Sequence, residues 1–346
     1  MTRNELLPSN GDFTGKHLLL AAKEAGAGAM FAALVREWQP EDGSVVIASP
    51  IAMLYFDGLP ILVIADDLSD EKLSELLISI KPDSVIVGAS VGRSIEKRLF
   101  IAAQASGMEV DVFVDHYWNL WQRFADPDTA QPWKYMPDRV YVPAVACAER
   151  LVTYGFPQER LRLFNHPLLE PEATKHQECL GSNLRINLEI PEDAVAVLFV
   201  SEYLFETDSQ WKWDQPCVED YVELLTLLLK ISARSNSGRP VVILVRPHPG
   251  ESQSRWDTMC NSISGSQWRN VGNISKDALF STTNLVFGLN SMMLMEAVAS
   301  GLQVYSYHSQ LSDRDCWLST IRPEIVELSN EEECIQIVES IREIKS

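Results

Sequence analysis

The sequence predicts an α/β protein of two Rossmann-like, doubly wound domains that face each other across a cleft. Three observations lead to this fold class. The chain has 346 residues, and at roughly 100–200 residues per domain this length suggests two domains. Short apolar runs alternate with longer amphipathic segments, which is typical of parallel sheets covered by helices. A polar stretch near the middle of the chain separates two series of this kind.

The first half contains seven expected strands. Their cores, such as LLL, ILVI and VFV, are nearly continuous apolar runs, which suit strands buried on both faces of a parallel sheet. The strands are expected at 17–22, 45–49, 61–65, 84–88, 111–115, 139–142 and 160–164. Helical patterns separate many of them, for example 71–80 and 94–106. Residues 1–168 are therefore predicted to form the first domain.

The second half follows a polar connection at 169–193 and is predicted to form a second domain at 194–346. It contains a long expected helix and five expected strands, at 218–233, 195–200, 241–245, 284–287, 303–307 and 325–328. A terminal helix is predicted at 330–345, with Asn330 as its cap and Glu333 completing a capping box. Ligands of such sheets bind beyond the carboxyl ends of the strands, so the cleft between the two domains is the expected site.

The composition excludes several classes of function. Lys and Arg number 29 against 48 Asp and Glu, so the formal net charge is −19. A nucleic-acid partner would need a net basic surface, and none is expected. Charge alone would not draw the chain to an anionic membrane, so a membrane-linked partner would have to be reached by peripheral contact. A locally positive site can still bind an anionic ligand.

The sequence also lacks targeting and metal signatures. It has no apolar run of roughly 18 residues that could span a membrane. Residues 1–15 contain no signal-peptide core, and the six cysteines form no CxxC pair. We therefore expect a cytoplasmic protein with reduced thiols and no transmembrane segment.

The first strand-to-helix loop, at 22–30, is rich in small residues. Gly26 and Gly28 would let a ligand approach the backbone on the acceptor side of the cleft. The dinucleotide pattern is incomplete, because Phe31 stands where it needs a small residue and the second strand ends without an acid. Close packing of the helix is the alternative explanation for these glycines.

Polar residues follow two other strands of the first domain. Asp115 ends the strand 111–115, where it could act as a general base on a hydroxyl or orient His116 for that role. Alternatively, Asp115 caps a helix that begins at His116. Glu96 is a weaker candidate on the acceptor side, because it also suits the second position of a helix capped by Ser94.

The strongest local signal is the sequence RPHPGE at 246–251, directly after an expected strand. Two prolines fix the backbone on both sides of His248. Arg246 offers a planar donor fork for phosphate, and His248 could donate to a phosphate oxygen or protonate a leaving phosphate. A rigid turn that only holds a hydrogen-bonded histidine is the alternative.

A second signal lies at 287–297, where a strand passes into a helix through Asn290 and Ser291. The amides after Ser291 would form a phosphate-binding helix N-terminus, and Glu296 could accept both hydroxyls of a ribose. The loop after the strand 195–200 completes the site, with Ser201 and Glu202 expected to contact phosphate or the transferred group. Trp211 and Trp213 could stack on a base or a sugar, or only cover the domain.

These motifs resemble the second domain of GT-B glycosyltransferases. The similarity rests on the His-Pro turn at 246–250, the helix start Asn290-Ser291, and Glu296 in EAVASG. It extends to inverting bacterial sialyl- and polysialyltransferases, to capsule and CDP-glycerol polymer transferases, and to UDP-N-acetylglucosamine 2-epimerases. The resemblance implies that His248 and Ser291 bind the nucleotide phosphates and that Glu296 binds the ribose.

The resemblance implies an inverting glycosyltransferase that moves a sugar from a nucleotide-sugar donor to a carbohydrate or polysaccharide-precursor acceptor. Retaining members carry a second Glu eight residues before the ribose Glu, and that position is Gly288 here. Asp115 or His116 would deprotonate the acceptor, and fixed donors including His248 would stabilise the leaving phosphate. No DxD motif stands at a strand end, so metal independence is expected, with the nucleotide sugar as co-substrate and no other cofactor. The alternatives are a nucleotide-sugar 2-epimerase and a non-catalytic binding protein of the same fold.

Overall fold

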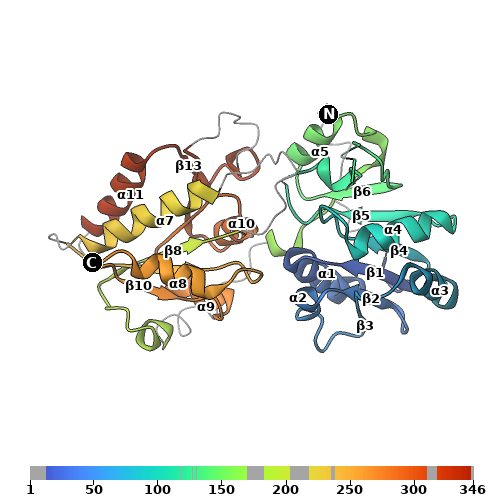
Figure 1. Ribbon diagram of the computed structural model, residues 1–346, viewed down its shortest axis with the longest axis horizontal. Coiled ribbons are helices and arrows are strands. Elements are labelled where there is room, and N and C mark those ends of the chain that lie inside the picture. Colours follow the sequence, from blue (N-terminus) through green and yellow to red (C-terminus); the bar gives the residue numbers. More distant parts are fainter. Residues whose placement is uncertain are drawn as a thin grey trace. The chain divides into compact units, whose positions relative to one another are not determined.

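A computed structural model describes residues 13–117, 119–126, 128–129, 131–169, 183–202, 218–234, 238–309 and 318–343. The chain divides into two compact units, Met1–Glu170 and Pro171–Ser346. Each unit is a parallel β-sheet flanked by helices (Figure 1). The predicted α/β class with two doubly wound, Rossmann-like sheets is confirmed.

The N-terminal unit is built on a seven-stranded sheet with the order β3-β2-β1-β4-β5-β6-β7, and all neighbouring strands are parallel. Every predicted strand of this half is present, because each apolar run can be buried between two helical layers. The strands are β1 (Leu18–Ala22), β2 (Val45–Ala48), β3 (Leu62–Ala65), β4 (Ser84–Val87), β5 (Val110–Phe113), β6 (Arg139–Val142) and β7 (Leu161–Leu163). β5 begins one residue earlier than predicted and ends two residues earlier, at Phe113, so Asp115 lies in the following loop.

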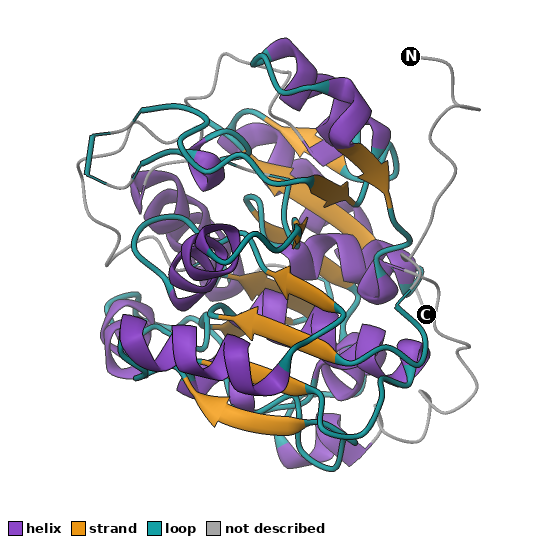
Figure 2. Cartoon of the chain, turned by 90° about the vertical axis from the view of Figure 1, so that its right-hand side faces the viewer, coloured by secondary structure: helices purple, strands orange, loops and turns teal. Residues whose placement is uncertain are grey.

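Helices cover both faces of this sheet (Figure 2). They are α1 (Ala25–Trp38), α2 (Pro50–Met53), α3 (Asp70–Ile80), α4 (Ile95–Ala105) and α5 (Val145–Thr153), with 3-10 turns at Gln122–Phe124, Gln158–Arg160 and Pro167–Leu169. Serine side chains cap three of them, since the hydroxyls of Ser49, Ser69 and Ser94 each accept from a backbone N–H in the first turn. α1 and α2 pack on the same apolar cluster, whereas α3 and α4 contact each other.

The C-terminal unit is built on a six-stranded parallel sheet with the order β10-β9-β8-β11-β12-β13. Its strands are β8 (Val195–Val200), β9 (Val241–Arg246), β10 (Trp268–Asn270), β11 (Leu285–Gly288), β12 (Gln303–Tyr307) and β13 (Val326–Leu328). Its helices are α7 (Val218–Ala233), α8 (Gln253–Asn261), α9 (Lys276–Thr282), α10 (Met292–Ala299) and α11 (Glu331–Glu343), with a 3-10 turn at Leu318–Thr320. β10 is absent from the sequence prediction, because three half-buried residues are too few to give an alternating or apolar pattern.

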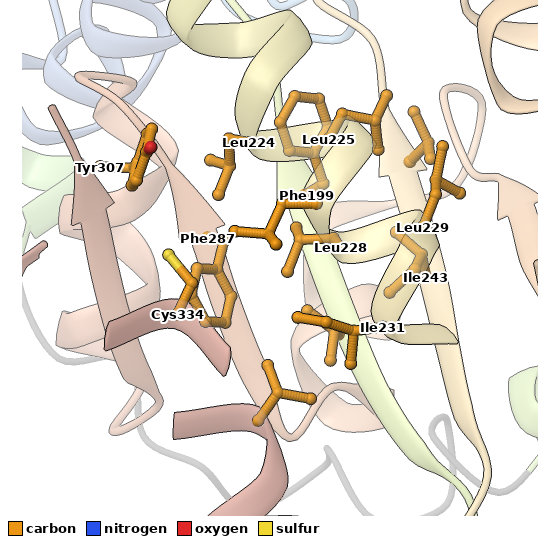
Figure 3. Packing of buried hydrophobic residues seen from close by; sticks show 14 of the residues in the cluster. Phe199, Leu224, Leu225, Leu228, Leu229, Ile231, Ile243, Phe287, Tyr307 and Cys334 are labelled. Atoms are coloured by element: carbon orange, nitrogen blue, oxygen red, sulfur yellow. The ribbon is translucent and has the colours of Figure 1, made fainter. Parts of the chain in front are cut away.

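The core of this unit lies between its sheet and α7 (Figure 3). Phe199 and Phe287 project from β8 and β11 toward Leu224 and Leu228 of α7. All four side chains are fully buried. α11 packs beside α7 and adds Cys334 to the same cluster. This core fixes the central strands, whose carboxyl ends carry the motif residues.

The predicted cap of the terminal helix needs a correction in one detail. Asn330 Oδ1 accepts from the N–H of Glu333 at 3.0 Å, as expected of a cap. The Glu333 carboxylate does not return to Asn330 but accepts from the N–H of Ser329 at 2.8 Å. The capping box is therefore shifted by one residue. In the predicted connection 169–193, residues 183–187 are helical.

Cys147, Cys260 and Cys334 are buried free thiols, and burial raises the pKa of each to about 12. Among the described residues, no helix is both long and apolar enough to cross a membrane.

Candidate functional site

The His-Pro turn is held by the end of the neighbouring strand β8. The backbone N–H of His248 donates to Ser201 Oγ and to Glu251 Oε2, both at 2.9 Å. Ser201 Oγ in turn donates to Glu251 Oε2. The turn closes on itself, because the N–H of Glu251 donates to the His248 carbonyl at 2.9 Å. His248 is thus fixed through its backbone, and its ring is half-buried.

A hydrogen bond to the His248 ring also indicates the tautomer of its neutral form. The N–H of Gly250 donates to His248 Nδ1 at 3.1 Å. An imidazole that accepts at Nδ1 carries the proton of its neutral form on Nε2. The turn therefore makes Nε2–H the donor that His248 offers to a ligand.

Glu251 is a residue that the sequence analysis did not assign. It is 9% exposed, and its Oε2 accepts from Ser201, from the His248 N–H and from Trp256 Nε1 at 3.1 Å. Burial raises the pKa of Glu251, and these three donors oppose the shift. Its position in PHPGE could have revealed this role, because Glu251 follows the histidine by three residues, the spacing that closes a turn.

Arg246, predicted to bind phosphate, also contacts the protein's own backbone. It is the last residue of β9, and its Nη1 donates to the carbonyls of Val271, at 3.1 Å, and Ile274. These contacts anchor the loop that follows β10. Part of the guanidinium is therefore committed to the protein's own backbone.

The second predicted turn, at the end of β11, is buried more deeply than the first. Asn290 is fully buried, and Ser291 caps α10 by accepting from the N–H of Met293 at 3.3 Å. Gly288 suits the end of β11, because a Cβ atom there would lie 3.1 Å from the Val200 carbonyl oxygen, a tight contact with the backbone. A glutamate side chain at this position would crowd the Val200 backbone.

Glu202 links this second turn to β8. Its carboxyl group accepts a hydrogen bond from the backbone N–H of Asn290 and lies near the Tyr221 hydroxyl. Burial raises its pKa to about 8, with a smaller contribution from the carboxylate of Glu251. Oε1 of Glu202 is buried and has no hydrogen-bond partner among the described residues. The carboxyl group is therefore largely protonated at neutral pH.

A series of buried polar side chains from β12 and β13 supports the same turn. Ser306 Oγ donates to the Leu289 carbonyl and lies 2.7 Å from His308 Nε2. Glu327 approaches His308 Nε2 at 3.3 Å and accepts from the N–H of Ser319 at 2.8 Å. β12 and β13 thus fix the backbone that precedes Asn290.

Glu296, the expected ribose ligand, lies in α10. Its Oε2 forms an ion pair of 3.0 Å with Lys276 Nζ at the start of α9, and its side chain is 12% exposed. The predicted residues Ser201, Arg246, His248, Asn290 and Ser291 are brought together at the ends of β9, β8 and β11, three adjacent strands. Trp211 and Trp213 lie outside the described residues.

In the N-terminal unit, Asp115 does not cap a helix. No helix begins at His116, which is half-buried and stacks on Tyr117 with ring centroids 4.6 Å apart. Asp115 is buried, with Oδ1 at 3.4 Å from Arg123 Nη1. Burial raises its pKa, and Arg123 opposes the shift. A Cβ atom at Gly26 would lie 2.6 Å from Asp115 Oδ2, so Gly26 makes room for this carboxyl group.

Glu96 joins two loops at the carboxyl edge of the same sheet. Its Oε1 accepts from the N–H of Lys23 at 2.9 Å, and its Oε2 accepts from the N–H of Ser90 at 2.8 Å and from the Ser90 hydroxyl. Burial raises its pKa against these hydrogen bonds. Ser94 caps α4 as in the alternative interpretation, and Glu96 also holds the β1–α1 loop against the β4–α4 loop.

The expected loop 22–30 is shorter than predicted, because α1 begins at Ala25. Gly28 lies inside this helix, and a Cβ atom there would lie 2.9 Å from the Ala52 Cα. Gly28 therefore allows α1 to pack on α2 and does not belong to an open ligand loop, which corrects the acceptor-side expectation for this residue.

Lys97 is a buried cation that the sequence analysis did not assign. Its Nζ donates to the Ala125 carbonyl at 3.2 Å and lies 5.7 Å from the centre of the Tyr135 ring. Burial lowers its pKa to about 8. Together with Glu96 and Arg123 it lines a cavity of about 20 Å³, which is room for one water molecule.

The chain has two α/β units, each built on a parallel sheet, and the second carries the His-Pro and Asn-Ser turns on either side of β8. This is the architecture of the GT-B fold. The sequence matches no protein-family model and no curated protein. Solved structures do match over nearly the whole chain. S. aureus MnaA, solved with UDP, is 12% identical and covers 94% of this chain and 88% of its own, with a TM-score of 0.63.

Two further solved structures are of different kinds. UDP-GlcNAc 2-epimerase from Neisseria meningitidis, bound to UDP-GlcNAc, is 11% identical, with a TM-score of 0.59 and coverage of 95% of this chain and 94% of that one. The wall teichoic acid polymerase TagF is 9% identical, with a TM-score of 0.53 and coverage of 94% and 81%. The resemblance to the GT-B superfamily is thus confirmed as a likeness of fold.

Proposed function

We propose that the C-terminal unit binds a nucleotide sugar and that the protein transfers the sugar to a carbohydrate or polysaccharide-precursor acceptor. The observation that carries this proposal is that two adjacent residues at the end of β8 each bond one of the motif turns. Ser201 bonds the His248 turn, and Glu202 bonds the Asn290 turn. One dipeptide thereby holds together the two turns that would bind the phosphates.

The chemistry of the turns supports a phosphate site. His248 presents Nε2–H, and Ser291 begins α10, whose first N–H groups and helix dipole favour an anion. Fixed donors of this kind stabilise negative charge on a departing phosphate without reorganising during the reaction. Arg246 contributes mainly by holding the loop that follows β10 in place.

An inverting reaction is the better supported course. The position of the second glutamate of retaining enzymes is Gly288, where a side chain would make a tight contact with the backbone of Val200. Asp115 or His116 would deprotonate the acceptor hydroxyl. Burial raises the pKa of Asp115, which makes its carboxylate a stronger base. We further propose that the transfer needs no metal ion.

A 2-epimerase is the second candidate, because several of the matching solved structures are UDP-GlcNAc 2-epimerases. The two activities differ in their need for an acceptor. Incubation with a nucleotide sugar alone should yield an epimerised sugar nucleotide only if the protein is an epimerase. A transferase should release the nucleotide only when an acceptor is added.

Nucleotide binding is tested by thermal shift with UDP, CMP, CDP, GDP and dTDP. A ligand at about 100 times its Kd stabilises the folded state by about 2.7 kcal/mol, which raises Tm by several degrees. We expect one nucleotide to give this shift, and His248→Ala to abolish it while Ser252→Ala, at an exposed serine, retains it. If no nucleotide shifted the wild type, both enzyme proposals would fail and a non-catalytic protein of this fold would be favoured.

A further inference from the structure

We propose that Glu202 is itself a ligand-contacting residue: its neutral carboxyl group donates a hydrogen bond from Oε1 to an anionic oxygen of the bound nucleotide. The inference rests on the nucleotide site proposed above and names a donor that its motifs do not include. It resolves how an acidic protein can place a glutamate beside a phosphate site.

The hydrogen bond to Glu202 fixes which oxygen carries the proton. The Asn290 N–H donates to the carboxyl group. Oε1 has no partner among the described residues, so this donor meets Oε2. In a neutral carboxyl group the oxygen that accepts a backbone N–H is the carbonyl oxygen, and the other carries the hydrogen. Oε1–H is therefore a buried donor with no acceptor in the described part of the chain.

The position of this donor relates it to the proposed phosphates. Its carboxyl group is hydrogen-bonded to the residue directly before Ser291, the N-cap of α10. The preceding residue, Ser201, is bonded to the His248 N–H. Glu202 thus lies between the two turns. An anion bound there would gain a donor, whereas an ionised carboxylate would repel it.

The surroundings keep the carboxyl group neutral. The groups that face Glu202 are the Tyr221 hydroxyl of α7, the Asn290 backbone after β11, and the Glu251 carboxylate after β9. Burial and the like charge of Glu251 raise the pKa of Glu202, and no cation is among the groups that shift it. A carboxylic acid held neutral by burial is an established way to supply a hydrogen-bond donor at pH 7.

The test follows UDP binding by calorimetry from pH 7.5 to 9.5, above the range in which the terminal phosphate titrates (roughly pH 6). If UDP is not the nucleotide bound, the tightest binder of the thermal-shift panel is used instead. Wild-type affinity should fall by up to about tenfold per pH unit once Glu202 ionises. Glu202→Gln keeps a donor and no charge, so its affinity should stay within about threefold of the wild type at pH 7.5 and remain flat above it. Glu202→Ala should bind about tenfold more weakly at pH 7.5.

Glu192→Gln, at an exposed glutamate of the same unit, serves as the matched control and should keep the wild-type pH profile. A wild-type profile that is flat, or a Glu202→Gln profile that declines like the wild type, overturns the inference and leaves nucleotide binding intact. If no nucleotide of the panel binds at any pH, the proposed function fails and the inference fails with it.

A second measurement needs no ligand. Carbon-13 NMR of protein labelled at glutamate carboxyl carbons should show one carbon titrating near pH 8, absent from Glu202→Gln. A Glu202 carbon that titrates in the ordinary acidic range would overturn the inference whatever the binding data show.

Discussion

Ser201 Oγ accepts a hydrogen bond of 2.9 Å from the backbone N–H of His248, across 47 positions of sequence. The bond joins the end of β8 to the turn after β9, the strand beside it in the sheet. A hydroxyl directed at a backbone group fixes where the turn lies without using the histidine ring. The ring is then left to serve a ligand through Nε2.

Removing this hydroxyl should weaken ligand binding more than it weakens the fold. In Ser201→Ala the His248 N–H keeps its bond to Glu251, so we expect a loss of about 1 kcal/mol in the free energy of unfolding. Nucleotide affinity should fall by about tenfold, because the turn is less well fixed. Urea denaturation and calorimetry measure the two effects, with Ser252→Ala as control. Unchanged affinity would show that Ser201 does not position the turn.

Gly26 and Asp115 should show strong coupling in a double-mutant cycle. Gly26→Ala forces a methyl group against the buried carboxyl group, and such overpacking costs about 1–3 kcal/mol. In an Asp115→Ala background the same substitution should be neutral or stabilising, since alanine favours helix α1. Denaturation of the wild type, both single variants and the double variant tests this. Additive effects would mean that the two groups do not touch.

The stability of the protein should depend on Glu202 with a definite sign. Its folded pKa of about 8 lies above the unfolded value of 4.5, so the folded state binds more protons between these values. The free energy of unfolding therefore falls as pH rises from about 4.5 to 8, by at most about 1.4 kcal/mol per pH unit. Glu202→Gln should become progressively more stable than the wild type across this window. A constant difference between pH 5 and 8 would contradict the shift.

The ionisation of Lys97 should have the opposite effect on stability, which should rise with pH. Its folded pKa of about 8 lies below the unfolded value of 10.5, so the unfolded state binds more protons between them. The wild type should therefore gain stability relative to Lys97→Met as pH rises from 8 to 10.5, by at most about 1.4 kcal/mol per unit. Lys72→Met, at an exposed lysine of α3, should show no such window. Parallel pH profiles for wild type and Lys97→Met would show that Lys97 keeps an ordinary pKa.

Glu296 can be tested as a ribose ligand by its choice between ribo- and deoxyribonucleotides. The wild type should bind UDP about tenfold more tightly than deoxy-UDP, since a lost hydrogen bond to a charged group costs about 1.5–3 kcal/mol. Glu296→Ala should bind both with equal, reduced affinity. Lys276→Met, which removes only the ion-pair partner, should retain the preference. Equal binding of both nucleotides by the wild type would exclude a contact to the 2′-hydroxyl.

Local sequence was sufficient for most of the fold. Every described strand except β10 was predicted, because buried parallel strands are read from continuous apolar runs such as VVILV in β9. The N-cap of α4 and the cap of α11 were readable for a similar reason, since a cap depends on residues only three positions apart. The turns at His248 and at Asn290-Ser291 were found from their proline, glycine and serine content alone.

The use of each polar side chain was decided by tertiary structure. Arg246 binds two carbonyls because β10 pairs with β9, a contact between segments 25 residues apart. Glu251 and Glu202 gained their donors only when the sheet order placed β8 between β9 and β11. Their pKa shifts follow from burial, which local sequence does not encode. The sequence by itself determined the elements and where the motif turns begin. Only the packing of the sheets decided which side chains hold those turns and which are left to meet a ligand.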